Sequence, residues 1–219
     1  MNVGEMFTYI SYVVDDLGFG YFTKPQLLRF LNQSAQECQK KLLAAGQNWY
    51  LKIDQTQTTI ANQKLYTLPT DLMDLNRIEL VQNPGINEIR VALTSITLNQ
   101  QDGFANVVAT PVAFYFQKNQ IALVPTPDNS VYTIRIYYSY RIPEVVLEAD
   151  IIDAPSEFHE YICNLAILKC FMKDGRDASL ILRYTDDVEK RLEKQAIQRA
   201  QDRANTIVIT SDDNFGPCF

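Results

Sequence analysis

The sequence predicts an α+β protein in which helix pairs from the two ends of the chain form one discontinuous bundle, with an antiparallel β domain inserted between them. Three observations predict this arrangement. Apolar residues recur at helical spacing near both ends, the middle of the chain has short β-favouring runs instead, and each terminal helix has one apolar face that needs a partner. We expect a first bundle segment at 1–48, the inserted β domain at 49–150, a second bundle segment at 151–204 and an extended C-terminal tail at 205–219.

The first two helices are predicted from their apolar spacing and their end signals. Apolar residues lie three and four apart between Val3 and Leu17. The second helix has Thr23 as its N-cap and Pro25 in its first turn, and it ends at Gly46. Two further helices are expected at 155–174 and 177–204, the last with mixed charges on its exposed positions.

The middle of the chain predicts strands separated by turn residues. The runs 112–117 and 120–124 are split only by Lys118 and Asn119, and a third run, 131–140, follows two prolines. This pattern predicts a three-stranded antiparallel meander. Because residues alternate in the last run, we expect one face of it to be buried and the other to be partly wet. Other β-favouring runs lie at 53–60, 64–68, 77–81 and 88–96.

Composition excludes several classes of protein. The formal charge is −6, with 47% hydrophobic and 21% charged residues, which is typical of a globular domain and argues against a protein drawn by its own field to nucleic acid or anionic lipid. The apolar runs are too short to span a membrane, and the first eighteen residues carry no Lys or Arg for a signal peptide. The four cysteines are scattered, so we expect reduced thiols in a cytoplasm, with Cys163 and Cys170 buried.

The chain offers little for catalysis, and we expect no enzyme, cofactor or metal. It has a single histidine, His159, which with Cys163 forms an i, i+4 pair of zinc-ligand types but has no other ligands near it in sequence. No nucleophile elbow, phosphate loop or dinucleotide fingerprint occurs. Glu157 and Glu160 are explained by the dipole of the helix that they begin. A peptidoglycan hydrolase that uses either of them as its acid is kept as an alternative.

Tyrosines are concentrated in the last part of the β segment. Alternate members are expected to be core residues, and the others to cover a subunit interface. The competing interpretation is a carbohydrate-binding or adhesin module, in which exposed rings stack on sugars. The tyrosines concerned are Tyr115, Tyr132, Tyr137, Tyr138 and Tyr140.

The last fifteen residues combine a β-like triplet, a polar run and two phenylalanines. Such a segment has no obvious way to fold alone, and it is the expected form of a tail that orders on a partner. The alternative is that it packs back on its own bundle. We take the partner-binding residues to be Ile207, Val208, Ile209, Phe215, Pro217 and Phe219.

The order of motifs resembles a known family. "LYTLPTDLMDLNRIEL" is followed by "PVAFYFQKNQIALVPTPDNSVYTIRIYYSYRIP", with "TKPQLLRFLNQSAQEC" before them and "DAPSEFHEYICNLAILKC" after them. Together these segments resemble the head-to-tail connector or adaptor proteins of short-tailed bacteriophages, also called tail tubular protein A or neck-ring proteins. The resemblance spans roughly residues 1 to 200 and depends on the order of the motifs.

The resemblance implies a structural virion protein, assembled in the host cytoplasm, with about twelve copies in a ring around the DNA exit channel. Such a ring lies between the portal protein and the tail nozzle or next neck ring protein, helps to retain the packaged genome and lets double-stranded DNA pass through its lumen. A lumen lined with carboxylates would repel phosphate and permit that passage. The carboxylates expected there are Asp186, Asp187, Glu189 and Glu193.

Overall fold

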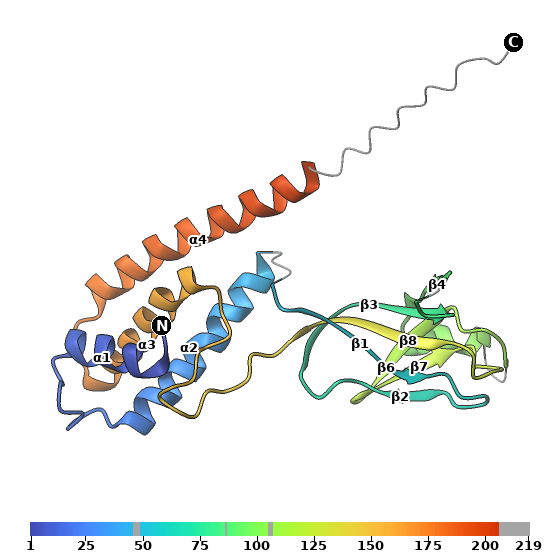
Figure 1. Cartoon of the computed structure of the whole chain (residues 1–219), viewed down its shortest axis with the longest axis horizontal. Helices are drawn as coiled ribbons and strands as arrows, with labels where there is room; N and C mark the ends of the chain where they lie inside the picture. The colour runs from blue at the N-terminus through green and yellow to red at the C-terminus, as the bar shows by residue number, and fades with distance from the viewer. Residues whose placement is uncertain (46–48, 86, 105–106, 206–219) are drawn as a thin grey trace, which may run out of the picture. The chain divides into compact units, whose positions relative to one another are not determined.

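The computed structural model describes residues 1–45, 49–85, 87–104 and 107–205, without the side chains at 101–102, 104, 192–193 and 195–205. The chain divides into two compact units, which Figure 1 shows as helices and strands. A helical unit comprises Met1–Gln47 and Ile142–Phe219, and a β unit comprises Asn48–Arg141. The α+β class and the insertion of a β segment between terminal helix pairs are confirmed.

The helical unit contains α1 (Val3–Val14), α2 (Lys24–Ala44), a short 3-10 turn η2 (Ser156–Phe158), α3 (His159–Asp174) and α4 (Ser179–Asn205). As predicted, α2 begins after Thr23, although the Thr23 side chain makes no capping hydrogen bond, and α3 ends at Asp174. Gly175 follows it with a positive φ of 69°. The first helix was expected to reach Leu17, but it ends at Asp15, whose φ is 59°. The Asp16 carboxylate accepts three backbone N–H groups from residues 20–22, and these bonds fold the chain into the turn before α2.

The third helix is the centre of the helical unit. It packs against each of α1, α2 and α4, and His159 and all residues from Tyr161 to Ile167 are buried. Both Cys163 and Cys170 are buried, as predicted. Because three helices pack against α3, its buried residues are spread around much of its circumference, and a simple one-faced periodicity describes it less well than α1.

The chain returns from the β unit along α2 and α1. The Ile142 N–H donates to Oε1 of Gln39 at 3.1 Å, and Asn32 bonds both the N–H and the carbonyl of Val145 at 3.0 Å. Further along, the Gly4 N–H donates to the Glu148 carbonyl at 2.9 Å. Residues 142–150, which the sequence assigned to the β domain, therefore lie in the helical unit. Long-range bonds to α1 and α2 decide this, and local composition does not report them.

The β unit consists of two four-stranded sheets, with strand orders β1-β8-β3-β4 and β2-β7-β6-β5. The named strands pair antiparallel except β5 with β6, which are parallel. A 3-10 segment η1 (Leu98–Phe104) follows β5. The strands are β1 (Leu51–Thr58), β2 (Leu65–Thr67), β3 (Leu72–Gln82), β4 (Ile89–Ala92), β5 (Thr94–Ser95), β6 (Ala113–Gln117), β7 (Gln120–Val124) and β8 (Thr133–Tyr140).

Of the predicted three-stranded meander, the first hairpin is confirmed and the pairing of the third strand is wrong. The β6–β7 hairpin exists, with Lys118 at a φ of 56° in its turn. The next strand, β8, does not pair with β7 but lies between β1 and β3 in the other sheet. The eight residues 125–132 are long enough to cross from one sheet to the other. The short connection between β7 and β8 therefore does not make these two strands neighbours in one sheet.

The core of the β unit lies between the two sheets. Ile78, Leu80 and Ile136 come from the first sheet, and Phe114 and Leu123 from the second. On the side of β8 opposite the core, Arg135 and Ser139 are nevertheless buried, and Arg135 is bonded to Glu88 and Gln55. As predicted, this face of the strand is partly wet: Thr133 and Tyr137 are half-buried.

Candidate interaction surfaces

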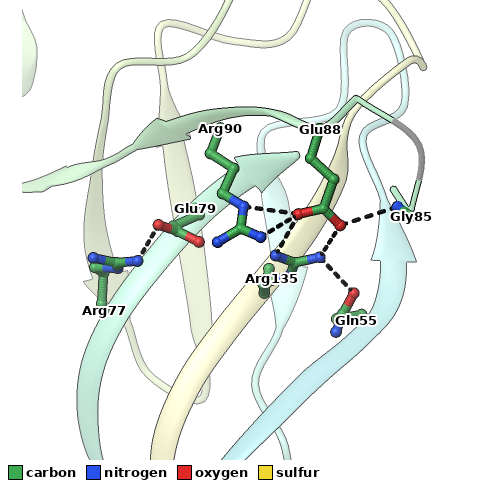
Figure 2. Close-up of polar contacts among 7 residues, drawn as sticks. All are labelled: Gln55, Arg77, Glu79, Gly85, Glu88, Arg90 and Arg135. Atoms are coloured by element: carbon green, nitrogen blue, oxygen red, sulfur yellow. Dashed lines mark hydrogen bonds and ion pairs between the residues drawn. The ribbon is translucent and has the colours of Figure 1, made fainter. Parts of the chain in front are cut away.

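A network of charged side chains covers the face of the first sheet that points away from the core. On β8, Ile134, Ile136 and Tyr138 belong to the core cluster, so the alternate residues Arg135 and Tyr137 point outward. On β3, Glu79 lies opposite Arg135, and Arg77 lies opposite Tyr137. Figure 2 shows Glu88, which immediately precedes β4, reaching the Arg135 guanidinium.

The Arg135–Glu88 pair is held by several hydrogen bonds. Nη2 of Arg135 donates to Oε1 of Glu88 at 2.8 Å, and Nη1 donates to Oε2 at 3.2 Å. Glu88 also accepts from Nε of Arg90 at 2.7 Å and from the Gly85 N–H at 3.0 Å, while Gln55 accepts from Arg135 at 3.1 Å. The bonds from Arg135, Gly85 and Arg90, in that order, lower the pKa of Glu88 to about 2. The pair stays charged at neutral pH and fixes the loop before β4 to the sheet.

A second ion pair extends the network. Arg77 pairs with Glu79, and its guanidinium lies 5.0 Å from the centre of the Tyr137 ring. Glu79 is 3% exposed, and the described residues provide no hydrogen-bond partner for its Oε2 or for Nε of Arg135. Buried charge is costly unless it is paired, and here Glu79 is paired with Arg77 and Arg135 with Glu88. Because breaking either pair would leave a buried charge alone, the pairs hold the side chains of this face in fixed positions.

Exposed apolar residues adjoin the network on the same face. Ile53 lies opposite Tyr137 in the β1–β8 pairing, and Leu51 lies opposite Ser139. Both side chains are exposed, and Arg77 is about half exposed. Tyrosine, arginine and aliphatic side chains held in fixed positions are typical of the centres of protein–protein interfaces. The outer face of this sheet, formed by Leu51, Ile53, Tyr137 and the charged network, is therefore a candidate contact surface.

The structure divides the predicted tyrosines between core and surface. Tyr115 and Tyr138 are buried, 5% and 1% exposed, and the Tyr138 hydroxyl donates to Asp71 at 2.9 Å. Tyr132, Tyr137 and Tyr140 are half-buried. The five rings therefore do not form an exposed row on which sugars could stack. A role in a subunit interface stays a prediction for Tyr132, Tyr137 and Tyr140 only.

The carboxylates predicted for a channel lining also differ from one another. Asp186 and Asp187 on α4 are exposed. Glu189 is half-buried, where it accepts a hydrogen bond from the Tyr161 hydroxyl at 3.0 Å and pairs with Lys41. Burial and then the Glu189 charge raise the pKa of Tyr161. The side chain of Glu193 lies outside the described residues, as do the predicted tail residues Ile207, Val208, Ile209, Phe215, Pro217 and Phe219.

The candidate chemical groups are engaged in structural contacts. Nδ1 of His159 lies 3.1 Å from the terminal amine of Met1, and Nε2 lies 3.1 Å from the Ala154 carbonyl. Burial, followed by the charge of that amine, lowers the pKa of His159. Burial also raises the pKa of Cys163 to about 12. Among the described residues no group of three or more His, Cys, Asp and Glu side chains could hold a metal ion.

Glu160, the possible acid of a hydrolase, accepts a hydrogen bond from the Tyr184 hydroxyl at 2.8 Å. This bond joins α3 to α4 and gives the carboxylate a structural role.

Within the described part of the chain, no helix has the length and hydropathy needed to cross a membrane.

Sequence reasoning missed two grooves beside α2. One, of about 390 Å³, lies between α2 and α3 and is lined by Gln26, Arg29, Phe30, Gln33, Lys169 and Lys173. The other, of about 520 Å³, lies between α2 and the returning chain at 144–146. The spacing of Lys169 and Lys173, four residues apart, is a signal that both lie on one side of α3. No pattern in the sequence around Arg29 predicts that it lies next to these two lysines, because it belongs to α2 and they belong to α3.

Comparison with known proteins gives one family. A family model described as "SU10 adaptor protein" matches residues 1–211, which include both helix pairs and the whole β unit. No curated protein matches the chain.

Proposed function

The chain belongs to the SU10 adaptor protein family, a family of phage adaptor proteins with a structural role, and from this premise we propose that it forms a ring at the head–tail junction of the virion. About twelve copies surround the DNA channel, as cyclic symmetry permits. The ring binds the portal protein on one side and the tail nozzle or next neck ring protein on the other. It assembles in the host cytoplasm, helps to retain the packaged genome and acts without catalysis.

The family match over residues 1–211 is the observation that carries this proposal. The geometry supports it in two ways. The helical unit is centred on the buried α3, which gives a ring wall a rigid element. The outer face of the β1-β8-β3-β4 sheet adds a fixed surface of arginine, tyrosine and exposed aliphatic residues, which fits a contact with a neighbouring subunit or a tail component.

The test is mass photometry of the full-length protein with its portal ring, compared with the chain truncated after Ala204. We expect saturable binding of many copies by the full-length chain and its loss on truncation, because residues 205–219 order on a partner. Binding that survives truncation would move the contact to the helical unit. Absence of binding across a range of salt concentrations would overturn the adaptor role.

The acidic lumen is part of the same proposal and has a separate test. Asp186 and Asp187 are exposed on α4, so they are free to face DNA in the channel. We expect Asp186→Lys with Asp187→Lys to slow DNA release from assembled particles. The matched variant Asp128→Lys with Glu144→Lys changes two exposed acids away from α4, alters the charge equally and should leave release unchanged. Equal release rates for both variants would place Asp186 and Asp187 outside the lumen.

A further inference from the structure

The groove between α2 and α3 is basic in a protein that is acidic overall. Its lining includes Arg29, Lys169 and Lys173 and no carboxylate, whereas the whole chain has a formal charge of −6. Phe30 adds an aromatic wall, and Gln26 and Gln33 add amide groups. Such a lining favours an occupant that carries both negative charge and apolar side chains.

Within the described part of the chain, two of the three bases form no ion pair with a carboxylate. Arg29 is exposed, and it makes no hydrogen bond or ion pair with any other residue in the described part of the chain. Nζ of Lys173 donates to the neutral Oε1 of Gln26 at 3.0 Å and lies 5.4 Å from the centre of the Phe22 ring. Only Lys169 has an acidic partner, Glu37, at 2.8 Å. The groove therefore offers two cations to a ligand.

The chain itself contains a segment of matching chemistry. We propose that the basic groove receives the acidic and aromatic part of the C-terminal segment, Asp212 to Phe215, from a neighbouring copy. Asp212 and Asp213 pair with Arg29 and Lys173, and Phe215 packs against Phe30. This inference rests on the proposed ring, since it needs copies side by side, and it names the neighbouring subunit as the partner of the tail.

A neighbouring copy is required because the groove is out of reach of the tail of the same chain. Lys173 lies six residues before the first residue of α4, which has 27 residues. A helix of this length spans about 40 Å, so Asn205 lies far from the groove. Asp212 is seven residues beyond Asn205, and seven extended residues cover at most about 24 Å. The tail therefore links each subunit to the next one.

The test uses a peptide of residues 206–219 with a fluorophore at its N-terminus, titrated with the full-length protein and followed by fluorescence anisotropy. We expect saturable binding that weakens as salt is added, because screening reduces the attraction between exposed charges. Arg29→Glu combined with Lys173→Glu should weaken peptide binding at least tenfold. A peptide with Asp212→Lys and Asp213→Lys should bind this reversed protein at least tenfold better than it binds the wild-type protein.

The matched control is Arg183→Glu with Lys190→Glu, two exposed bases of α4 outside the groove, which changes the net charge equally. It should bind the wild-type peptide normally, and circular dichroism of both double variants should show the wild-type helix content. Equal losses in the groove and control variants, or failure of the reversed pair to recover, would overturn the proposal. So would a groove variant that loses binding of duplex DNA but keeps binding of the peptide, since the groove would then bind phosphates.

The result separates this inference from the ring itself. If the protein assembles on the portal but the peptide does not bind, the groove assignment is wrong and the proposed function stands. If the peptide binds as described but no copies assemble on the portal, the groove is occupied by the tail in another assembly and the portal adaptor role is wrong.

Discussion

Asn32 on α2 fastens the returning chain to the helical unit through two hydrogen bonds. Its Nδ2 donates to the Val145 carbonyl, and its Oδ1 accepts from the Val145 N–H, both at 3.0 Å. Val145 is buried, so neither backbone group finds water easily once the amide is gone. The change to test is Asn32→Leu, which keeps the approximate volume of the side chain and removes both partners.

The expected loss is about 2–3 kcal/mol in the free energy of unfolding. Two hydrogen bonds contribute about 1 kcal/mol each, and leaving a buried backbone group without a partner adds about 1 kcal/mol. The better helix propensity of leucine returns about 0.5 kcal/mol. Asn32→Asp should cost less, because a carboxylate oxygen still accepts from the Val145 N–H while the donor to the carbonyl is lost.

The assay is urea denaturation followed by circular dichroism at 222 nm, with hydrogen exchange of the amides at 142–150. The control is Gln33→Leu, the next residue of α2, which is exposed and should change stability by less than about 0.5 kcal/mol. If Asn32→Leu is as stable as this control, or if exchange at 142–150 does not accelerate, the two bonds do not hold the returning chain and the reasoning is refuted.

Three further predictions concern groups with shifted pKa values. Glu88 has a folded pKa of about 2, below its ordinary 4.5, so the unfolded state binds more protons between these two pH values. The stability of the wild-type protein should therefore fall as the pH drops from 4.5 to 2. The thermal midpoint of Glu88→Gln should fall less over the same pH range than that of the wild-type protein. The pKa of His159 is lowered from 6.5, so stability should also fall as the pH drops through 6.5; a pH 5–7.5 series that is equally steep for His159→Gln would contradict this. Burial raises the pKa of Cys38, Cys163 and Cys170 to about 12, so mass spectrometry should find no iodoacetamide adduct on them at pH 8 until urea unfolds the protein.

The helices could be predicted because their signals are local. The N-cap Thr23 with Pro25, and the stop at Gly175, each act within a few residues. The place of β8 could not be predicted in this way. Its alternating residues identify a strand, but its position between β1 and β3 depends on core contacts such as those of Ile136 with the opposite sheet.

The candidate surfaces were less predictable than the fold. Arg135 is visible in the sequence only as a polar residue in an alternating strand, and its partner Glu88 is 47 residues away. In the same way, the basic groove depends on α2 and α3, which are far apart in the sequence. A single sequence reports spacing along an element, whereas both surfaces come from the packing of separate elements.

The pairing of β1 with β8 has a consequence for how the β unit is inserted. The β1–β8 ladder pairs Leu51 with Ser139, and the Tyr140 N–H donates to the Tyr50 carbonyl at 3.0 Å, so the chain enters and leaves the unit through adjacent strands. The two attachment points are therefore about one strand spacing apart, roughly 5 Å. Because the two ends of the insertion lie this close together, a short turn or another domain with adjacent termini can replace the β unit. The distance between the two points where the chain leaves and re-enters the helical bundle would then stay the same.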